Sequence, residues 1–210
     1  MSSFSGPRRG ERADALRNTQ RILDATAEVL ATDPAATLEQ VALRAGVSRA
    51  TVYHHFDGRD ALLDALTEQS IRDVKAALDV VCPDEDSAAT ATERMLCAAW
   101  QVIGRYRGLL IVNPQRLEGS DLRARMEPVL GPVRAVIARG QRDGEFDPEL
   151  PVEWLLGILT DVIHAASRQV TAGAMNPDEA ERALLRTARA ALTSHAYTMS
   201  AAKPRRRTRH

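Results

Sequence analysis

The feature that most restricts the fold is a pair of short amphipathic helices delimited within residues 37–58. Thr37, followed three residues later by Gln40, is a capping-box start, and Gly46 is a natural C-terminal glycine for the first helix. Ser48 is a good N-cap for the second helix, and an Asp-Gly pair then ends it. The sequence therefore predicts two short helices joined by a tight turn.

These helices and their turn, Ala45–Ser48, have the helix-turn-helix layout, in which the second helix lies in the DNA major groove. At about 100° per residue, Val52 and Phe56 share one side of the second helix. Small and polar side chains occupy the opposite side, where they allow a close approach to bases. The candidate DNA contacts are Thr37, Ser48, Arg49, Ala50, Thr51, Tyr53, His54 and Arg59.

Each residue type on the exposed side of the second helix suggests a particular contact. Ala50 and Thr51 carry methyl groups that can touch thymine, and His54 and Arg49 can donate to base acceptors or phosphates. Tyr53 is better placed for a phosphate. Arg49 could instead be an ordinary solvated charge.

Two helix starts are candidate phosphate sites, because a helix N-terminus favours an anion. Arg59 stands at the start of a long helix expected over 59–81, and Thr37 stands at the start of the first short helix. Arg59, too, could be a solvated surface charge. His55 is interpreted as a packed or backbone-bonding residue. A metal site formed with its neighbour His54 is disfavoured, since adjacent helical residues point about 100° apart.

Helical periodicity continues through the rest of the chain, so we expect an all-α protein. Plentiful Ala and Leu, with aromatic residues at only 4%, also favour helix over sheet. The expected organisation is a flexible basic arm (1–13), a helix-turn-helix domain (14–58), a larger helical domain (59–200) that begins with the connecting helix 59–81, and a disordered basic tail (201–210). The arm either touches DNA or is a solvated, fraying end.

Prolines set the expected helix boundaries in the second half. One helix is expected from Ser87 until Asn113-Pro114 halts it. Pro128 and Pro132 predict that Gly119–Gly140 divides into a short and a longer helix. Two further helices are expected to begin at Pro151 and after the Asn176-Pro177 pair.

Composition excludes several other classes of protein. The 28 basic and 28 acidic side chains cancel, so a nucleic-acid or membrane partner must be met by a local patch. Cys82 and Cys97 form no CxxC motif and have no His pair at metal-ligand spacing, which argues against a zinc site or a disulfide framework. No apolar run approaches a membrane span. We therefore expect a cytoplasmic protein without a cofactor, a metal or a membrane partner.

The stretch 38–56, LEQVALRAGVSRATVYHHF, continued by RDALL from residue 59, resembles the DNA-binding domain of the TetR family of transcriptional regulators. The resemblance covers roughly residues 14 to 65, and three features occur together: the Ala-Gly-Val-Ser turn, the Tyr-x-His-Phe end and the charged start of the next helix. Tyr53 and His54 match the contact pair of the family, in which an aromatic residue commonly stands at the place of His54. Arg59 stands where lysine is usual, and Gly58 replaces a more usual Ser or Asn cap.

The resemblance implies that the helix after Ser48, the second of the two short helices, reads DNA. It also implies that a helical C-terminal domain dimerises through its last two long helices, and that a small ligand in that domain switches DNA affinity. An apolar, ring-containing effector is expected, because large apolar side chains in this half can line a cavity, although ordinary core or dimer contacts would also explain them. These candidate pocket residues are Met95, Trp100, Tyr106, Met126 and Trp154.

Three polar residues, Asp161, His164 and Arg168, form one stripe on the otherwise apolar helix that starts at Pro151. They orient a ligand, pair across a dimer, or face water. No Ser or Cys nucleophile at a recognisable elbow accompanies His164 and Asp161, so a catalytic triad is unsupported.

The sequence therefore predicts an all-helical homodimeric regulator that binds a palindromic operator in double-stranded DNA. We expect it to act as a repressor that is released when a small molecule fills the C-terminal domain. The connecting helix is the expected lever, since its start touches the DNA backbone and its length reaches the ligand domain. The alternative is a helical ligand-binding or interaction protein whose helix-turn-helix does not bind DNA, although Tyr53, His54 and Arg59 argue against it. An enzyme is the more distant alternative.

Overall fold

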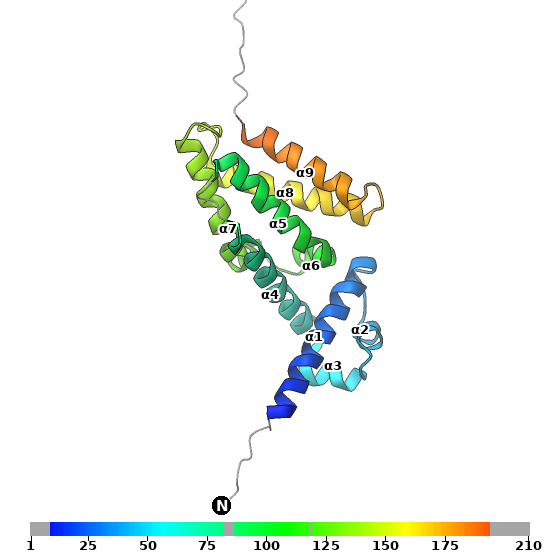
Figure 1. Cartoon of the computed structure of the whole chain (residues 1–210). Coiled ribbons are helices and arrows are strands. Elements are labelled where there is room, and N and C mark those ends of the chain that lie inside the picture. Colours follow the sequence, from blue (N-terminus) through cyan, green and yellow to red (C-terminus); the bar gives the residue numbers. More distant parts are fainter. Residues whose placement is uncertain (1–8, 82–85, 118, 194–210) are drawn as a thin grey trace, which may run out of the picture.

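Over residues 9–81, 86–117 and 119–193, which the computed structural model describes, the protein consists of helices joined by short loops and has no strand (Figure 1). This confirms the predicted all-α class. Residues 1–8 of the predicted arm and the whole predicted tail, 201–210, lie outside the described residues. The elements are α1 (Arg9–Thr32), α2 (Leu38–Ala45), α3 (Arg49–His55), α4 (Gly58–Asp79), α5 (Ala88–Ile103), a 3-10 helix (Gly104–Tyr106), α6 (Arg107–Arg116), α7 (Gly119–Arg142), α8 (Val152–Thr171) and α9 (Pro177–Leu192).

Helices α1 to α3 and the first half of α4 enclose one hydrophobic core. Ile22 of α1, Val52 of α3 and Leu62 of α4 lie in this core and are almost completely buried. The capping box of α2 is confirmed: the Thr37 hydroxyl accepts from the Gln40 backbone N–H, and the Gln40 side chain accepts from the Thr37 backbone N–H at 2.7 Å. Local signals therefore set both short helices where the sequence predicted them.

The core of the N-terminal helices also includes the 3-10 helix and α6, which come from the other half of the chain. Tyr106, Leu109 and Val112 pack in the same cluster as α1 and α4. At Gly108 the approach to α1 is so close that a Cβ atom would lie 2.5 Å from the carbonyl oxygen of Leu30. Only glycine fits there, and α6 is thereby held against the end of α1.

The single helix predicted from Ser87 to Asn113 is wrong. The helix that begins after Ser87 ends at Ile103, and a 3-10 helix then redirects the chain into α6, which continues past Pro114 to Arg116. The change of direction lets α6 pack on α1. Because that contact joins segments far apart in the sequence, no local periodicity reports it.

The predicted division of Gly119–Gly140 into two helices is also wrong, since α7 is continuous. Pro128 and Pro132 lie one turn apart and are exposed, while Val129 and Ile137 of the same helix are buried. Carbonyl groups that lose a helical partner next to an exposed proline can be hydrated, so the helix tolerates both residues.

A second hydrophobic cluster joins α4, α5, α7, α8 and α9 into the C-terminal bundle. Helices α8 and α9 lie side by side across it (Figure 1). The predicted start of α9 is confirmed, because the Asn176 side chain accepts from the Glu179 backbone N–H at 2.9 Å and Glu179 reciprocates. Among the described helices, none has the length and apolar character needed to span a membrane.

Candidate nucleic-acid interface

Helix α3 is placed by the turn that precedes it. Gly46 adopts a φ of 65°, which favours glycine, and ends α2. The Ser48 side chain accepts from the Thr51 backbone N–H at 3.0 Å and so caps α3. Arg21 of α1 donates to the carbonyl oxygen of Ala45 at 2.7 Å. The turn is thus tied to α1, which orients α3 relative to the rest of the domain.

The two sides of α3 differ as the sequence predicted. Val52 has 0% exposure and the C-cap residue Phe56 is buried, so this side faces the core. The opposite side carries Ala50 and His54, which are exposed, together with the half-buried Thr51. The structure therefore brings the predicted base-reading residues onto one accessible surface, and their contact with DNA stays a prediction.

Arg49 and Tyr53 form the flank of this surface and contact each other. The Arg49 guanidinium lies 5.4 Å from the centroid of the Tyr53 ring and pairs with Glu39 of α2. Hydrogen bonding to Tyr53 and the charge of Glu39 raise the pKa of Arg49. Glu39 was not predicted as part of the site, because the pair joins two helices and no spacing within one helix signals it. These contacts hold the arginine beside α3.

His55 lies on the other flank and is half-buried. Its Nδ1 is 3.2 Å from the hydroxyl oxygen of Thr19 in α1. The residue is therefore packed against α1, as interpreted from the sequence, and it helps to hold α3 rather than facing outward with His54.

Arg59 has a structural role that the sequence did not predict. Its Nε and Nη2 donate to the carbonyl oxygens of Ala36 at 3.2 Å and Pro34 at 2.7 Å. These bonds attach the start of α4 to the connection between α1 and α2. A phosphate contact by Arg59 stays a prediction, and it would have to use the N–H donors of Nη1 or the second N–H of Nη2, which these two bonds leave available. Thr37 likewise uses its hydroxyl for capping.

The structure separates the predicted pocket residues instead of grouping them around one cavity. Met95 and Met126 pack in the main C-terminal cluster, Trp100 packs with α8 and α9, and Tyr106 belongs to the N-terminal core. Trp154 is 59% exposed. The sequence identified apolar side chains correctly but could not assign each to its cluster.

Two of the predicted site residues in the C-terminal half, Tyr106 and His164, have shifted pKa values. Burial, followed by a hydrogen bond to Asp73, raises the pKa of Tyr106 to about 12. Burial lowers the pKa of His164, and Arg168 lowers it further while Asp161 acts in the opposite direction. Asp161 and Arg168 themselves are exposed. Tyr106 is therefore a neutral hydrogen-bond donor at neutral pH, and it joins the 3-10 helix to α4.

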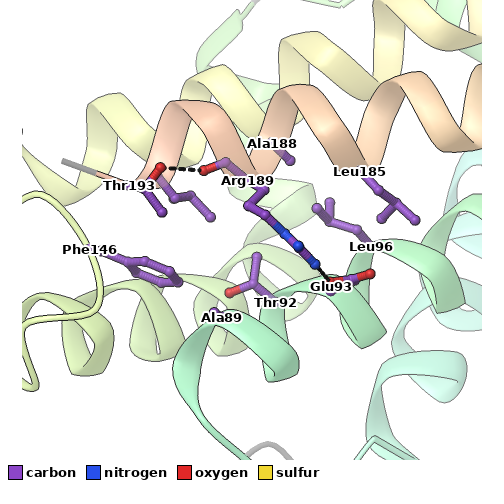
Figure 2. A pocket seen from close by; sticks show the side chains of 10 residues that line it. Ala89, Thr92, Glu93, Leu96, Phe146, Leu185, Ala188, Arg189 and Thr193 are labelled. Carbon is purple, nitrogen blue, oxygen red and sulfur yellow. Dashed lines mark hydrogen bonds and ion pairs between the residues drawn. The ribbon is translucent and has the colours of Figure 1, made fainter. Parts of the chain in front are cut away.

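A small recess lies between α5 and α9, as Figure 2 shows. Its volume is about 20 Å³, and the ion pair between Glu93 and Arg189 extends across it. A cavity of at least about 10–15 Å³ is needed to hold one water molecule, so the recess has room for little more than that. None of the predicted pocket residues lines this recess, which is too small for an organic effector.

Comparison with known proteins agrees with the N-terminal geometry. Residues 22–66 match the family model of bacterial regulatory proteins, tetR family. The uncharacterized HTH-type transcriptional regulator TtgW of Pseudomonas putida is 46% identical over 56 residues, which are 26% of this chain and 42% of that protein. The HTH-type transcriptional regulator SrpR of the same species is 45% identical over 56 residues, which are 26% of each protein. The match thus spans less than half of either relative.

Solved structures share the whole architecture. The TetR-like regulator LfrR from Mycobacterium smegmatis, in complex with proflavine, superposes with a TM-score of 0.69 at 24% identity, over 86% of this chain and 99% of that one. The regulator FadR from Bacillus subtilis, in complex with stearoyl-CoA, gives a TM-score of 0.65 at 17% identity, over 82% and 98%. At these identities the likeness shows the fold.

Proposed function

We propose that this chain, whose residues 22–66 match the tetR family model and whose fold is that of TetR-like regulators, is a transcriptional regulator of this family that binds double-stranded DNA. The observation that carries the proposal is the two-sided α3, whose core-facing Val52 opposes the accessible Ala50, Thr51 and His54. Such a helix can enter the major groove without exposing apolar core residues. Arg49 and Tyr53 lie beside it and supply phosphate or base contacts.

The regulator acts as a homodimer on a palindromic operator. Support comes from one exposed stripe along α8, which carries Trp154, Gly157, Asp161 and Arg168 at helical spacing. A large exposed aromatic side chain is typical of an interface, and the two opposite charges would complement each other in a two-fold arrangement. Trp154→Glu should therefore convert the dimer to a monomer at micromolar concentration in analytical ultracentrifugation. A wild-type protein that is already monomeric there would contradict the dimer.

Effector binding in the C-terminal bundle releases the operator, and two connections are suited to transmit the signal. The first is the contact of α6 with α1 at Gly108 and Leu30. The second joins α4 to α6 and α7, because Asp64 of α4 pairs with Arg116 and Arg125 at 3.0 and 2.9 Å. A movement of α6 would consequently move both α1 and α4, and a movement of α7 would move α4. The proflavine and stearoyl-CoA complexes of the structural neighbours support a small-molecule effector.

A mobility-shift titration with DNA flanking its own gene, repeated at several salt concentrations, tests the DNA-binding function. We expect the logarithm of affinity to fall linearly with the logarithm of salt concentration, because phosphate contacts release counterions. The protected half-sites should lie about 34–36 Å apart or a multiple of that distance. Tyr53→Ala should weaken binding, whereas Arg142→Ala at the exposed end of α7, outside the DNA-binding domain and the expected dimer helices, should not. Equal affinity for random DNA at moderate salt would favour the alternative, a ligand-binding protein whose helix-turn-helix is inactive.

A further inference from the structure

Arg107, the first residue of α6, is the polar group whose surroundings are least explained by the fold. Its side chain is half-buried, and its buried Nε has no hydrogen-bond partner among the described residues. Within the described part of the chain, no carboxylate forms an ion pair with it. Arg116 also has a buried Nε, but its guanidinium pairs with Asp64. A partly desolvated guanidinium without a counter-charge is costly, so its retention calls for a reason.

The guanidinium of Arg107 is held over an aromatic ring. It lies 5.9 Å from the centroid of the Trp100 ring, and Trp100 is 3% exposed. Gly104 provides the space, because a Cβ atom there would lie 3.2 Å from Arg107 Nη2. Stacking on an aromatic face orients a guanidinium while leaving the donors along its edge available. The fold thus presents a positioned cation with unused donors.

A second unsatisfied polar group lies on the helix that packs against α6. Ser167 of α8 is 2% exposed, and no residue in the described ranges forms a hydrogen bond with its hydroxyl. The preceding residue, Ala166, packs in the same apolar cluster as Trp100, together with Leu184 of α9. Buried hydroxyls normally have a partner, so the Ser167 hydroxyl, one residue after a member of the Trp100 cluster, is a candidate donor to an acceptor on a ligand.

We propose that the corner where α5, α6 and α8 meet binds an amphipathic organic anion as the effector, an inference that rests on the proposed ligand-responsive function. Arg107 and Ser167 bind the carboxylate or phosphate group, and the apolar body lies against Trp100 and its cluster. An oxyanion supplies the charge-assisted hydrogen bonds that the guanidinium lacks. Arg107 directly precedes Gly108, so occupation of this corner acts at the contact between α6 and α1. This effector class differs from the apolar, ring-containing molecule that the sequence predicts, because it carries a charged head group.

Tryptophan fluorescence provides a direct test without DNA. The chain has two tryptophans, so Trp154→Phe leaves Trp100 as the single reporter. The probes are octanoate, octan-1-ol and inorganic phosphate. We expect octanoate to change Trp100 fluorescence and raise the melting temperature at concentrations at least about tenfold lower than octan-1-ol, since a charged hydrogen bond is worth that factor or more. A response to phosphate alone would assign the head group to the phosphate class, and its absence would assign it to carboxylates.

Matched variants identify the residues responsible. Arg107→Gln should abolish the preference for octanoate over octan-1-ol, and Gly104→Ala should weaken it by displacing the guanidinium. Arg105→Gln should preserve it, because this neighbouring arginine already pairs with Asp24. Ser167→Ala should weaken octanoate binding about two- to tenfold.

Equal binding of octanoate and octan-1-ol, or a preference that survives Arg107→Gln, overturns the proposal. DNA binding that persists without any octanoate response refutes this site alone. Octanoate binding by a protein with no affinity for DNA instead refutes the proposed function and leaves the anion site standing.

Discussion

Gly108→Ala tests whether the contact between α6 and α1 controls the DNA-binding helices. The added Cβ would lie 2.5 Å from the Leu30 carbonyl oxygen and 2.6 Å from Leu30 Cβ. Contacts between carbon atoms are optimal at about 3.5–4.0 Å, so the two helices must separate by roughly 1 Å. Backbone and Cβ atoms cannot rotate away, and overpacking of this kind costs about 1–3 kcal/mol of folding free energy.

The loss of stability should lower the melting temperature by about 2–12 °C, because about 2–4 °C corresponds to each kcal/mol in a protein of this size. Val52 of α3 lies in the same hydrophobic cluster as Leu30. A displaced α1 should therefore also change the presentation of α3 and lower operator affinity. Circular dichroism melting gives the first quantity. A mobility-shift titration, at a temperature where the variant is fully folded, gives the second.

Two other glycines provide controls for this experiment. A Cβ on Gly140 would lie 2.3 Å from Phe146 Cδ2, so Gly140→Ala overpacks the C-terminal bundle and should reduce stability without weakening DNA binding. Gly131→Ala meets only the ends of the flexible Glu127 and Arg134 side chains, at 3.4 and 4.0 Å, and should be neutral or stabilising by up to about 1 kcal/mol. The reasoning fails if Gly108→Ala melts like the wild type, or if it weakens DNA binding no more than Gly140→Ala.

Three further substitutions have defined outcomes. His54→Ala should cost about 1–3 kcal/mol of operator binding and relax preference at one base position, as measured on a set of singly altered operators; unchanged preference would exclude a base contact. Arg59→Ala should lower the melting temperature, because the carbonyl oxygens of Pro34 and Ala36 lose their donor. If Arg59 also contacts a phosphate, the substitution should reduce the slope of log affinity against log salt concentration by about 1. An unchanged slope would leave Arg59 only its structural role. Burial lowers the pKa of His164, so the unfolded chain binds the proton first as pH falls, and the free energy of unfolding should decrease below about pH 6.5. Urea titrations at pH 7.5 and 5.5 should show a smaller decrease for His164→Gln, and an identical decrease would contradict this account.

Helix boundaries followed from the sequence wherever they depend on interactions within one turn. The capping boxes of α2 and α9 join residues three apart, and Ser48 caps α3 through the same spacing. Val52 and His54 lie on opposite sides of α3, and this too follows from helical geometry alone. The two sides of α3, and with them the accessible surface proposed to read DNA, could therefore be predicted in detail from a short stretch of sequence.

Proline signals were misleading, and one helix break was missed, where tertiary packing decided the outcome. Pro128 and Pro132 lie within a continuous α7 because both face solvent, a property that local sequence does not report. The break at Gly104 is required by the packing of α6 on α1 and not by a strong local stop. In both cases the outcome depends on how distant helices pack together.

What the sequence determined by itself is the all-helical class, the capped helix-turn-helix and the two faces of α3, because each rests on residues within about one or two helical turns. Only the tertiary structure decided which partner each inward side chain meets. It assigned Tyr106 to the N-terminal core, left Trp154 exposed, bonded Arg59 to two carbonyl oxygens and, among the described residues, gave Arg107 no carboxylate partner. Periodicity reports that a side chain points inward but not what lies opposite it, and that information exists only once distant helices have packed.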